Sequence, residues 1–102
     1  MTKILLCCSA GMSTSMLVKK MQQAAESQNL KTQIEAHSVS SFAEKIEEFD
    51  VCLLGPQVRF QLEALRPLAE QLGKGIDVIS PLDYGMMKGD KVLEQALTLA
   101  TN

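Results

Sequence analysis

A cysteine, a glycine and four hydroxyl side chains lie within eight consecutive residues near the start of the chain. The segment reads Cys8-Ser-Ala-Gly-Met-Ser-Thr-Ser15 and begins where the apolar run Ile4–Cys8 ends. The glycine permits a positive φ or the close approach of a ligand to the backbone. Successive backbone N–H groups in such a turn, with a helix N-terminus behind them, form an anion-binding nest. The segment therefore predicts a site for a dianion such as a phosphoryl group.

Cys8 is the candidate nucleophile of this site. A cysteine reacts as its thiolate, which the amide dipoles of a nest and a helix N-terminus favour. Beside a phosphate cradle, such a sulfur would accept and release a phosphoryl group by in-line transfer. This interpretation requires a sulfur that a donor can reach. The residues alone leave a structural interpretation equally open, because serine-rich turns are also ordinary helix caps and small residues at strand ends are often core.

Other residues are predicted to lie near Cys8 because they follow later strands. Gln57 follows a buried strand and would hydrogen-bond the phosphoryl group or a partner, or serve only in a turn. Asp83 is the nearest general acid, although turn formation is the ordinary role of a loop aspartate. Met12, with Met86 and Met87, would form an adaptable docking patch or pack locally.

Composition narrows the classes of function. The chain has 102 residues, 46% of them hydrophobic, and a net charge of −2, which gives no basic field for nucleic acid. Its longest apolar run is far short of the ~20 residues that span a bilayer. Three cysteines and His37, without C-x₂-C spacing, predict neither a structural zinc nor a disulfide framework. We expect a cytoplasmic protein of one domain that needs no metal or organic cofactor.

Strand-like and helix-like segments alternate along the chain. The expected strands are Lys3–Cys8, Thr32–Ser38, Asp50–Leu54 and Ile76–Ile79. The expected helices are Ser13–Asn29, a short one opened by a capping box at Ser41–Glu44, Val58–Leu72 with a kink or restart at Pro67, and a last one capped by Asp90.

This order predicts an α/β fold with right-handed crossovers and helices on both faces of a four-stranded parallel sheet. The first and third strands are the most apolar, which gives the strand order 2-1-3-4. In such sheets ligands bind at the carboxyl ends of the strands, where the winding direction reverses. That point lies between the first and third strands, and its loops are Cys8–Ser15 and Gly55–Gln57. Cys7 and Cys52 are expected to be small core residues, and His37 an ordinary residue on the polar side of an edge strand.

The Cys8–Ser15 motif, together with Leu53-Leu54-Gly55-Pro56-Gln57 and Tyr84-Gly85, resembles the lactose/cellobiose-type IIB component of the bacterial sugar phosphotransferase system. The resemblance covers nearly the whole chain and implies one IIB domain over residues 1–102. It implies a phosphocarrier: Cys8 takes a phosphoryl group from a phosphohistidine of a IIA protein. Cys8 then donates this group to a sugar, a disaccharide in this family, that enters through the membrane IIC transporter.

The same resemblance implies the surroundings of Cys8. The phosphate cradle would consist of Ser9, Ala10, Gly11, Met12, Ser13, Thr14 and Ser15, with Gln57 and Tyr84 as accessory residues. The domain would work in the cytoplasm, peripherally associated with the membrane transporter.

Three alternatives remain beside the carrier. The loop is similar to that of the low-molecular-weight tyrosine phosphatases, which share the fold and use Cys-x₅-Arg-Ser, but Thr14 stands at the arginine position. Without that guanidinium, efficient hydrolysis loses its stabilisation of transition-state charge. A non-enzymatic anion-binding module would leave Cys8 unmodified by a phosphoryl donor. Thiol-redox catalysis would need a partner thiol, and adjacent Cys7 and distant Cys52 suit Cys8 poorly.

Overall fold

The computed structural model describes residues 1–9 and 12–100, with side chains at residues 1–9 and 14–100. Within these residues the sheet has four strands: β1 (Thr2–Cys8), β2 (Thr32–Ser38), β3 (Val51–Leu54) and β4 (Gly75–Val78). All neighbouring strands are parallel, and their order is β2-β1-β3-β4. The predicted fold class and strand order are therefore confirmed. The central position of β1 follows from its apolar sequence, since both of its faces are covered.

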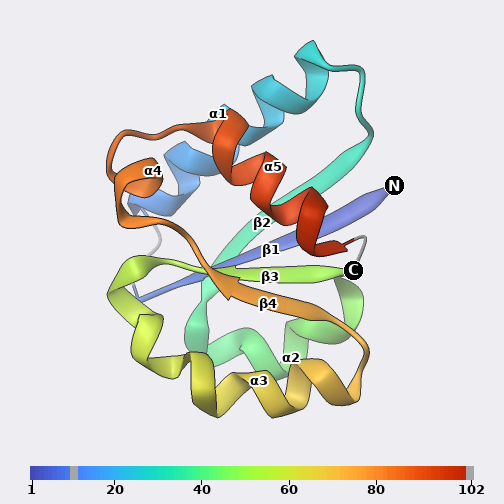
Figure 1. Cartoon of the computed structure of the whole chain (residues 1–102), viewed down its shortest axis with the longest axis vertical. Coiled ribbons are helices and arrows are strands. Elements are labelled where there is room, and N and C mark those ends of the chain that lie inside the picture. The colour runs from blue at the N-terminus through green and yellow to red at the C-terminus, as the bar shows by residue number, and fades with distance from the viewer. Residues whose placement is uncertain (10–11, 101–102) are drawn as a thin grey trace.

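Helices cover both faces of the sheet (Figure 1). On one face lie α1 (Met12–Ser27) and α5 (Gly89–Ala100), and on the other lie α2 (Phe42–Lys45) and α3 (Leu62–Gln71). The remaining helix, α4 (Pro81–Gly85), follows β4 at the carboxyl end of the sheet. Three 3₁₀ segments complete the described helical structure: η1 (Val39–Ser41), η2 (Ile46–Glu48) and η3 (Pro56–Gln61).

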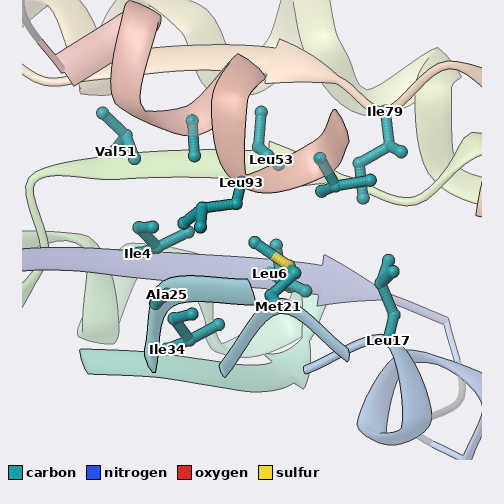
Figure 2. Close-up of a cluster of buried hydrophobic side chains, with 12 residues drawn as sticks. Ile4, Leu6, Leu17, Met21, Ala25, Ile34, Val51, Leu53, Ile79 and Leu93 are labelled. Atoms are coloured by element: carbon teal, nitrogen blue, oxygen red, sulfur yellow. The ribbon is translucent and has the colours of Figure 1, made fainter. Parts of the chain in front are cut away.

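Strand alternation divides the core into two clusters. Ile4 and Leu6 of β1 point toward α1 and α5, where they pack with Met21 and Leu93 (Figure 2). Leu5 and Cys7 point to the opposite face and join the cluster under α2 and α3. Cys8 continues the alternation, so it belongs to the α1 face at the very end of the strand.

Cys7 and Cys52 are core residues, as predicted. Both are completely buried, and their sulfur atoms lie 3.8 Å apart. The hydrogen bond to Cys7, with burial, raises the pKa of the Cys52 thiol well above its usual value. Both cysteines therefore pack in the core, and the raised pKa makes Cys52 a poor nucleophile.

For the segment after β3, the prediction of one helix from Val58 with a break at Pro67 is wrong. The chain enters η3 at Pro56, leaves helical geometry at Val58 (φ −115°, ψ 21°) and begins α3 at Leu62. Proline at the first position of η3 presets its φ, which explains the earlier start. Pro67 lies inside α3 on the exposed side, where its ring points to solvent and the helix loses only one hydrogen bond.

Two predicted helix caps are also wrong. Ser41 makes no side-chain cap bond; Ser38 instead accepts a hydrogen bond from the Ser40 N–H at 3.3 Å, because a 3₁₀ turn follows directly on β2. Asp90 lies within the first turn of α5, which begins at Gly89, where its charge favours the helix N-terminus. Helix α4 was predicted as loop, although Ser80-Pro81 was a signal for a helix start.

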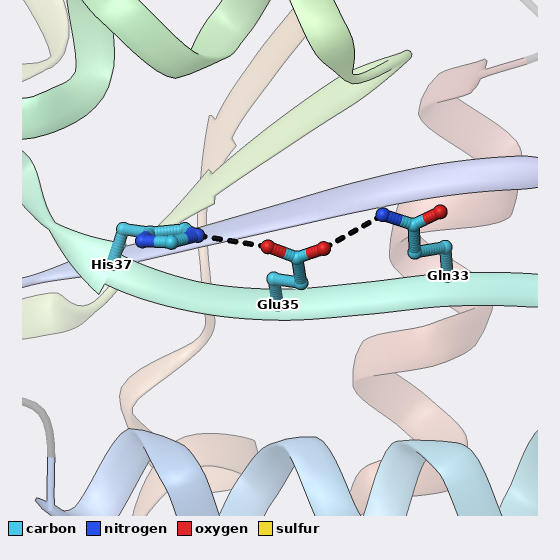
Figure 3. Close-up of polar contacts among 3 residues, drawn as sticks. All are labelled: Gln33, Glu35 and His37. Atoms are coloured by element: carbon cyan, nitrogen blue, oxygen red, sulfur yellow. Dashed lines mark hydrogen bonds and ion pairs between the residues drawn. The ribbon is translucent and has the colours of Figure 1, made fainter.

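β2 was correctly predicted as an edge strand with one polar face. Glu35 accepts hydrogen bonds from Gln33 Nε2 at 2.6 Å and bonds with His37 Nε2 at 2.9 Å (Figure 3). His37 is half-buried rather than fully solvated, because its ring packs edge-on to Phe49 at 6.4 Å between centroids. These bonds, chiefly the one to His37, hold the pKa of Glu35 below its usual value.

Candidate functional site

Cys8 lies at the carboxyl end of β1, directly before the segment that leads into α1. Gly55, which follows β3, donates its N–H to the carbonyl oxygen of Cys7 at 2.8 Å. This bond joins the two loops that the sequence placed at the reversal of winding. Ala10 and Gly11 lie outside the described residues, as do the side chains of Met12 and Ser13. Their predicted part in a phosphate cradle therefore stays a prediction.

The Cys8 side chain is completely buried, with no exposed surface. This differs from the sulfur open to a donor that the sequence interpretation requires. A side chain at Gly55 would contact Cys8 Cβ at 3.6 Å, so the turn after β3 packs directly beside it. The structure thus shows a covered cysteine, and a reagent reaches this sulfur only after atoms around it move. Ser9 and Ser15, near the two ends of the Cys8–Ser15 segment, are exposed.

Three predicted site residues from three different elements meet in one hydrogen-bonded group. Gln57 Nε2 of η3 donates to the Tyr84 hydroxyl of α4 at 3.0 Å. The same hydroxyl hydrogen-bonds Thr14 Oγ1 in the first turn of α1, at 3.1 Å. Among the described residues Thr14 is the one buried polar side chain, and this bond satisfies it. The sequence named these residues, but it contained no signal that they bond to one another.

Gly55 leaves room for the side chain of Gln57. A Cβ on residue 55 would lie 2.6 Å from Gln57 Oε1, so the amide of Gln57 occupies the space that a larger residue would fill. The backbone of Gly55 is extended (φ −61°, ψ 149°), a conformation open to any residue. The glycine therefore provides room, which lets Gln57 fold back toward Cys8 and reach Tyr84.

Asp83 does not face this group. Together with Asp77, Lys91 and Glu94 it lines a groove of about 400 Å³ between β4, α4 and α5. None of the described residues that line this groove comes from the Cys8–Ser15 segment. The position gives no support to Asp83 as a general acid for chemistry at Cys8.

Exposed apolar side chains surround the carboxyl end of the sheet. Met16 of α1, Phe60 of η3, and Leu82 and Met86 at α4 are each between 59% and 74% exposed. The elements that carry them lie on the same side of the molecule, where β1 and β3 end (Figure 1). Of the predicted docking residues, Met86 fits this surface. Met87 does not, because it packs against the core cluster under α1 and α5.

No group of three or more histidine, cysteine or acidic side chains is arranged to hold a metal ion in the described part of the chain. Among the helices of residues 12–100, none has the length and apolar character needed to cross a membrane.

Comparison with known proteins assigns the chain to a family. The family model for the lactose/cellobiose-specific IIB subunit of the phosphotransferase system matches residues 3–95. The oligo-β-mannoside-specific EIIB component of Bacillus subtilis is 42% identical over 102 residues, covering 100% of this chain and 99% of its own. The galactose-specific EIIB component of Lactococcus lactis subsp. cremoris is 46% identical over 101 residues and 94% of each chain.

A solved structure agrees with these relatives. The cellobiose-specific IIB component of Borrelia burgdorferi superimposes with a TM-score of 0.83 at 42% identity, covering 99% of this chain and 93% of that one. Members of this family are phosphotransferases that carry a phosphoryl group for sugar uptake. The chain, with Cys8 at the end of its central strand, belongs to the lactose/cellobiose-specific IIB family of the sugar phosphotransferase system.

Proposed function

We propose that Cys8 is the residue that carries the phosphoryl group. The observation that supports this most is its position: Cys8 ends the central strand where the winding reverses, in front of the N-terminus of α1. The first N–H groups of a helix have no intrahelical acceptor and bind anions. Cys7 and Cys52 lie in the opposite core cluster, and the pKa of Cys52 is raised, so neither competes as a nucleophile.

Two in-line transfers would make up the reaction. In the first, the atoms that cover Cys8 move aside and its thiolate attacks phosphorus of a phosphohistidine on a IIA protein. The S–P bond forms, the N–P bond breaks, and the freed imidazole takes a proton. In the second, a sugar hydroxyl oxygen attacks the same phosphorus, the S–P bond breaks, and the hydroxyl loses its proton. Cys8 leaves as the thiolate, ready for the next cycle. Each step exchanges one phosphorus bond for another, so no external energy source is required.

The partners follow from the same role. The exposed apolar side chains Met16, Phe60, Leu82 and Met86 around the carboxyl end of the sheet suit successive docking of a IIA protein and a membrane IIC transporter. The domain would work at the cytoplasmic face of that transporter. The relatives are named for oligo-β-mannoside, galactose and cellobiose, and we assign this chain a disaccharide such as the cellobiose of one of them.

Intact-protein mass spectrometry tests the assignment. After incubation with the phosphohistidine form of a IIA protein, the wild type should gain the mass of one phosphoryl group. Cys8→Ala should gain none, whereas Cys52→Ala, which removes a buried thiol from the opposite face, should gain it as the wild type does. A phosphoryl group that persists in Cys8→Ala would refute the role of Cys8.

A further inference from the structure

Tyr84 joins the two sides of the Cys8 site. On one side its hydroxyl bonds to Thr14, which is completely buried in the first turn of α1. On the other side it accepts a hydrogen bond from Gln57, which folds over Gly55 beside Cys8. A phenolic hydroxyl can accept one hydrogen bond and donate another, so a single oxygen can hold both neighbours.

We propose that Tyr84 is a positioning residue for phosphoryl transfer at Cys8. The inference rests on the proposed function and adds to it a residue that acts through Thr14 and Gln57. The bond to Thr14 fixes the first turn of α1, whose N–H groups would face the phosphoryl group. The bond to Gln57 fixes the side chain that covers the approach beside Gly55. Tyr84 thereby sets the position of both relative to the sulfur.

The difference in mobility between Gln57 and Tyr84 gives a reason for this role. Gln57 is exposed, and an exposed glutamine side chain has several rotamers of similar energy unless a bond selects one. The ring of Tyr84 is half-buried and packs against the core cluster under α1 and α5, so its hydroxyl has a fixed position. A rigid donor and acceptor on α4 therefore orders a side chain that would otherwise be mobile.

Tyr84→Phe tests the inference, because it removes one oxygen atom and keeps the ring in the core. With the phosphohistidine form of a IIA protein as donor, the single-turnover rate of transfer to Cys8 should fall about tenfold or more, because the variant loses both hydrogen bonds of this hydroxyl. The donor concentration at half-maximal rate should not change, because the docking surface is intact. Alkylation of Cys8 by iodoacetamide should become faster, since Gln57 no longer has its anchor.

Thr14 supplies matched controls. Thr14→Val removes the hydroxyl at nearly constant shape and should show part of the loss seen in Tyr84→Phe, because Gln57 still bonds to Tyr84. Thr14→Ser keeps the hydroxyl and should retain more of the rate than Thr14→Val. Since Tyr84→Phe already lacks the bond to Thr14, the double variant Tyr84→Phe/Thr14→Val should be no slower than Tyr84→Phe alone. Thermal unfolding of each variant shows whether it is folded.

The outcomes separate this inference from the proposed function. A wild type that takes up no phosphoryl group refutes the function of Cys8, and the iodoacetamide rate then still measures whether Tyr84 orders the site. A wild type that is phosphorylated, with Tyr84→Phe unchanged in both transfer and alkylation, overturns the role of Tyr84. Losses that multiply in the double variant would also overturn it, because the residues would then act independently.

Discussion

Gly89 is the point of closest approach between α1 and α5, the two helices that cover the Cys8 face of the sheet. A Cβ at this position would lie 2.4 Å from the carbonyl carbon of Lys20 and 2.6 Å from its oxygen. Non-bonded carbon atoms prefer about 3.5–4.0 Å. Gly89→Ala therefore forces α1 and α5 to separate by about 1 Å, since a backbone cannot turn aside as a flexible side chain can.

The cost of this separation can be worked from the packing. Inserting one methyl group into a close-packed region costs about 1–3 kcal/mol. Here the methyl group meets the backbone of α1. Separating the helices would also loosen the core cluster that contains Met21 and Leu93. Alanine in place of glycine in a helix returns up to about 1 kcal/mol. We expect a net loss of about 1–2 kcal/mol in the free energy of unfolding, and a fall in Tm of roughly 4–16 °C.

Urea denaturation of Gly89→Ala and Gly85→Ala measures this effect against a matched control. A Cβ at Gly85, in α4, would meet nothing within 4 Å, so Gly85→Ala should be neutral or stabilising by up to about 1 kcal/mol. If the free energy of unfolding falls with urea concentration at the same slope in both variants, they unfold from comparable native states. A Gly89→Ala protein as stable as the wild type would show that α1 and α5 do not meet closely at this residue.

Two further substitutions test the core and the polar face of β2. Cys52→Ser should lower the free energy of unfolding by about 1–3 kcal/mol in urea denaturation, because a hydroxyl replaces a thiol among buried apolar side chains, while transfer to Cys8 stays unchanged. Glu35→Gln should destabilise by less than about 1 kcal/mol, because Glu35 is 40% exposed and solvent screens its bonds. Since the pKa of Glu35 is lowered in the folded state, this stabilisation is present above the unfolded pKa and lost as the pH falls through the folded one. Stability measured from pH 7 to pH 3 should therefore converge for the wild type and Glu35→Gln, and a constant difference would contradict the cause assigned to this shift.

The arrangement of the sheet could be predicted because its signals are local and strong. The apolar runs of β1 and β3 and the alternation of β2 determine which strands are central, and right-handed crossovers then leave one strand order. Asn29, where the first helix was expected to end, adopts the left-handed conformation that asparagine tolerates (φ 56°). Helix starts were predicted less well, because Pro56 and Ser38 act through the geometry at which the preceding strand ends.

The site was predicted as a set of residues and not as an arrangement. Sequence placed Cys8, Thr14, Gln57 and Tyr84 near one edge of the sheet, since all follow strands or begin helices there. The bonds of Tyr84 were not predictable, because they depend on how α4 packs against α1 and η3, and the residues around Cys8 left its burial open. Tertiary contacts of this kind have no periodic signal in the sequence.

Thr14 gives the chemical reason why this site should carry a phosphoryl group rather than hydrolyse its ester. The similar phosphatases have an arginine at this position, whereas here Thr14 is completely buried and bonded to Tyr84, and its hydroxyl carries no charge. Loss of one such charge-stabilising donor typically slows attack on the reacting group by ~10²–10³-fold. Water should therefore attack phosphorylated Cys8 ~10²–10³-fold more slowly than it attacks the phosphocysteine of a phosphatase that has the arginine, which intact mass spectrometry over time can measure. Hydrolysis as fast as in such a phosphatase would mean that the missing guanidinium is not what protects the ester.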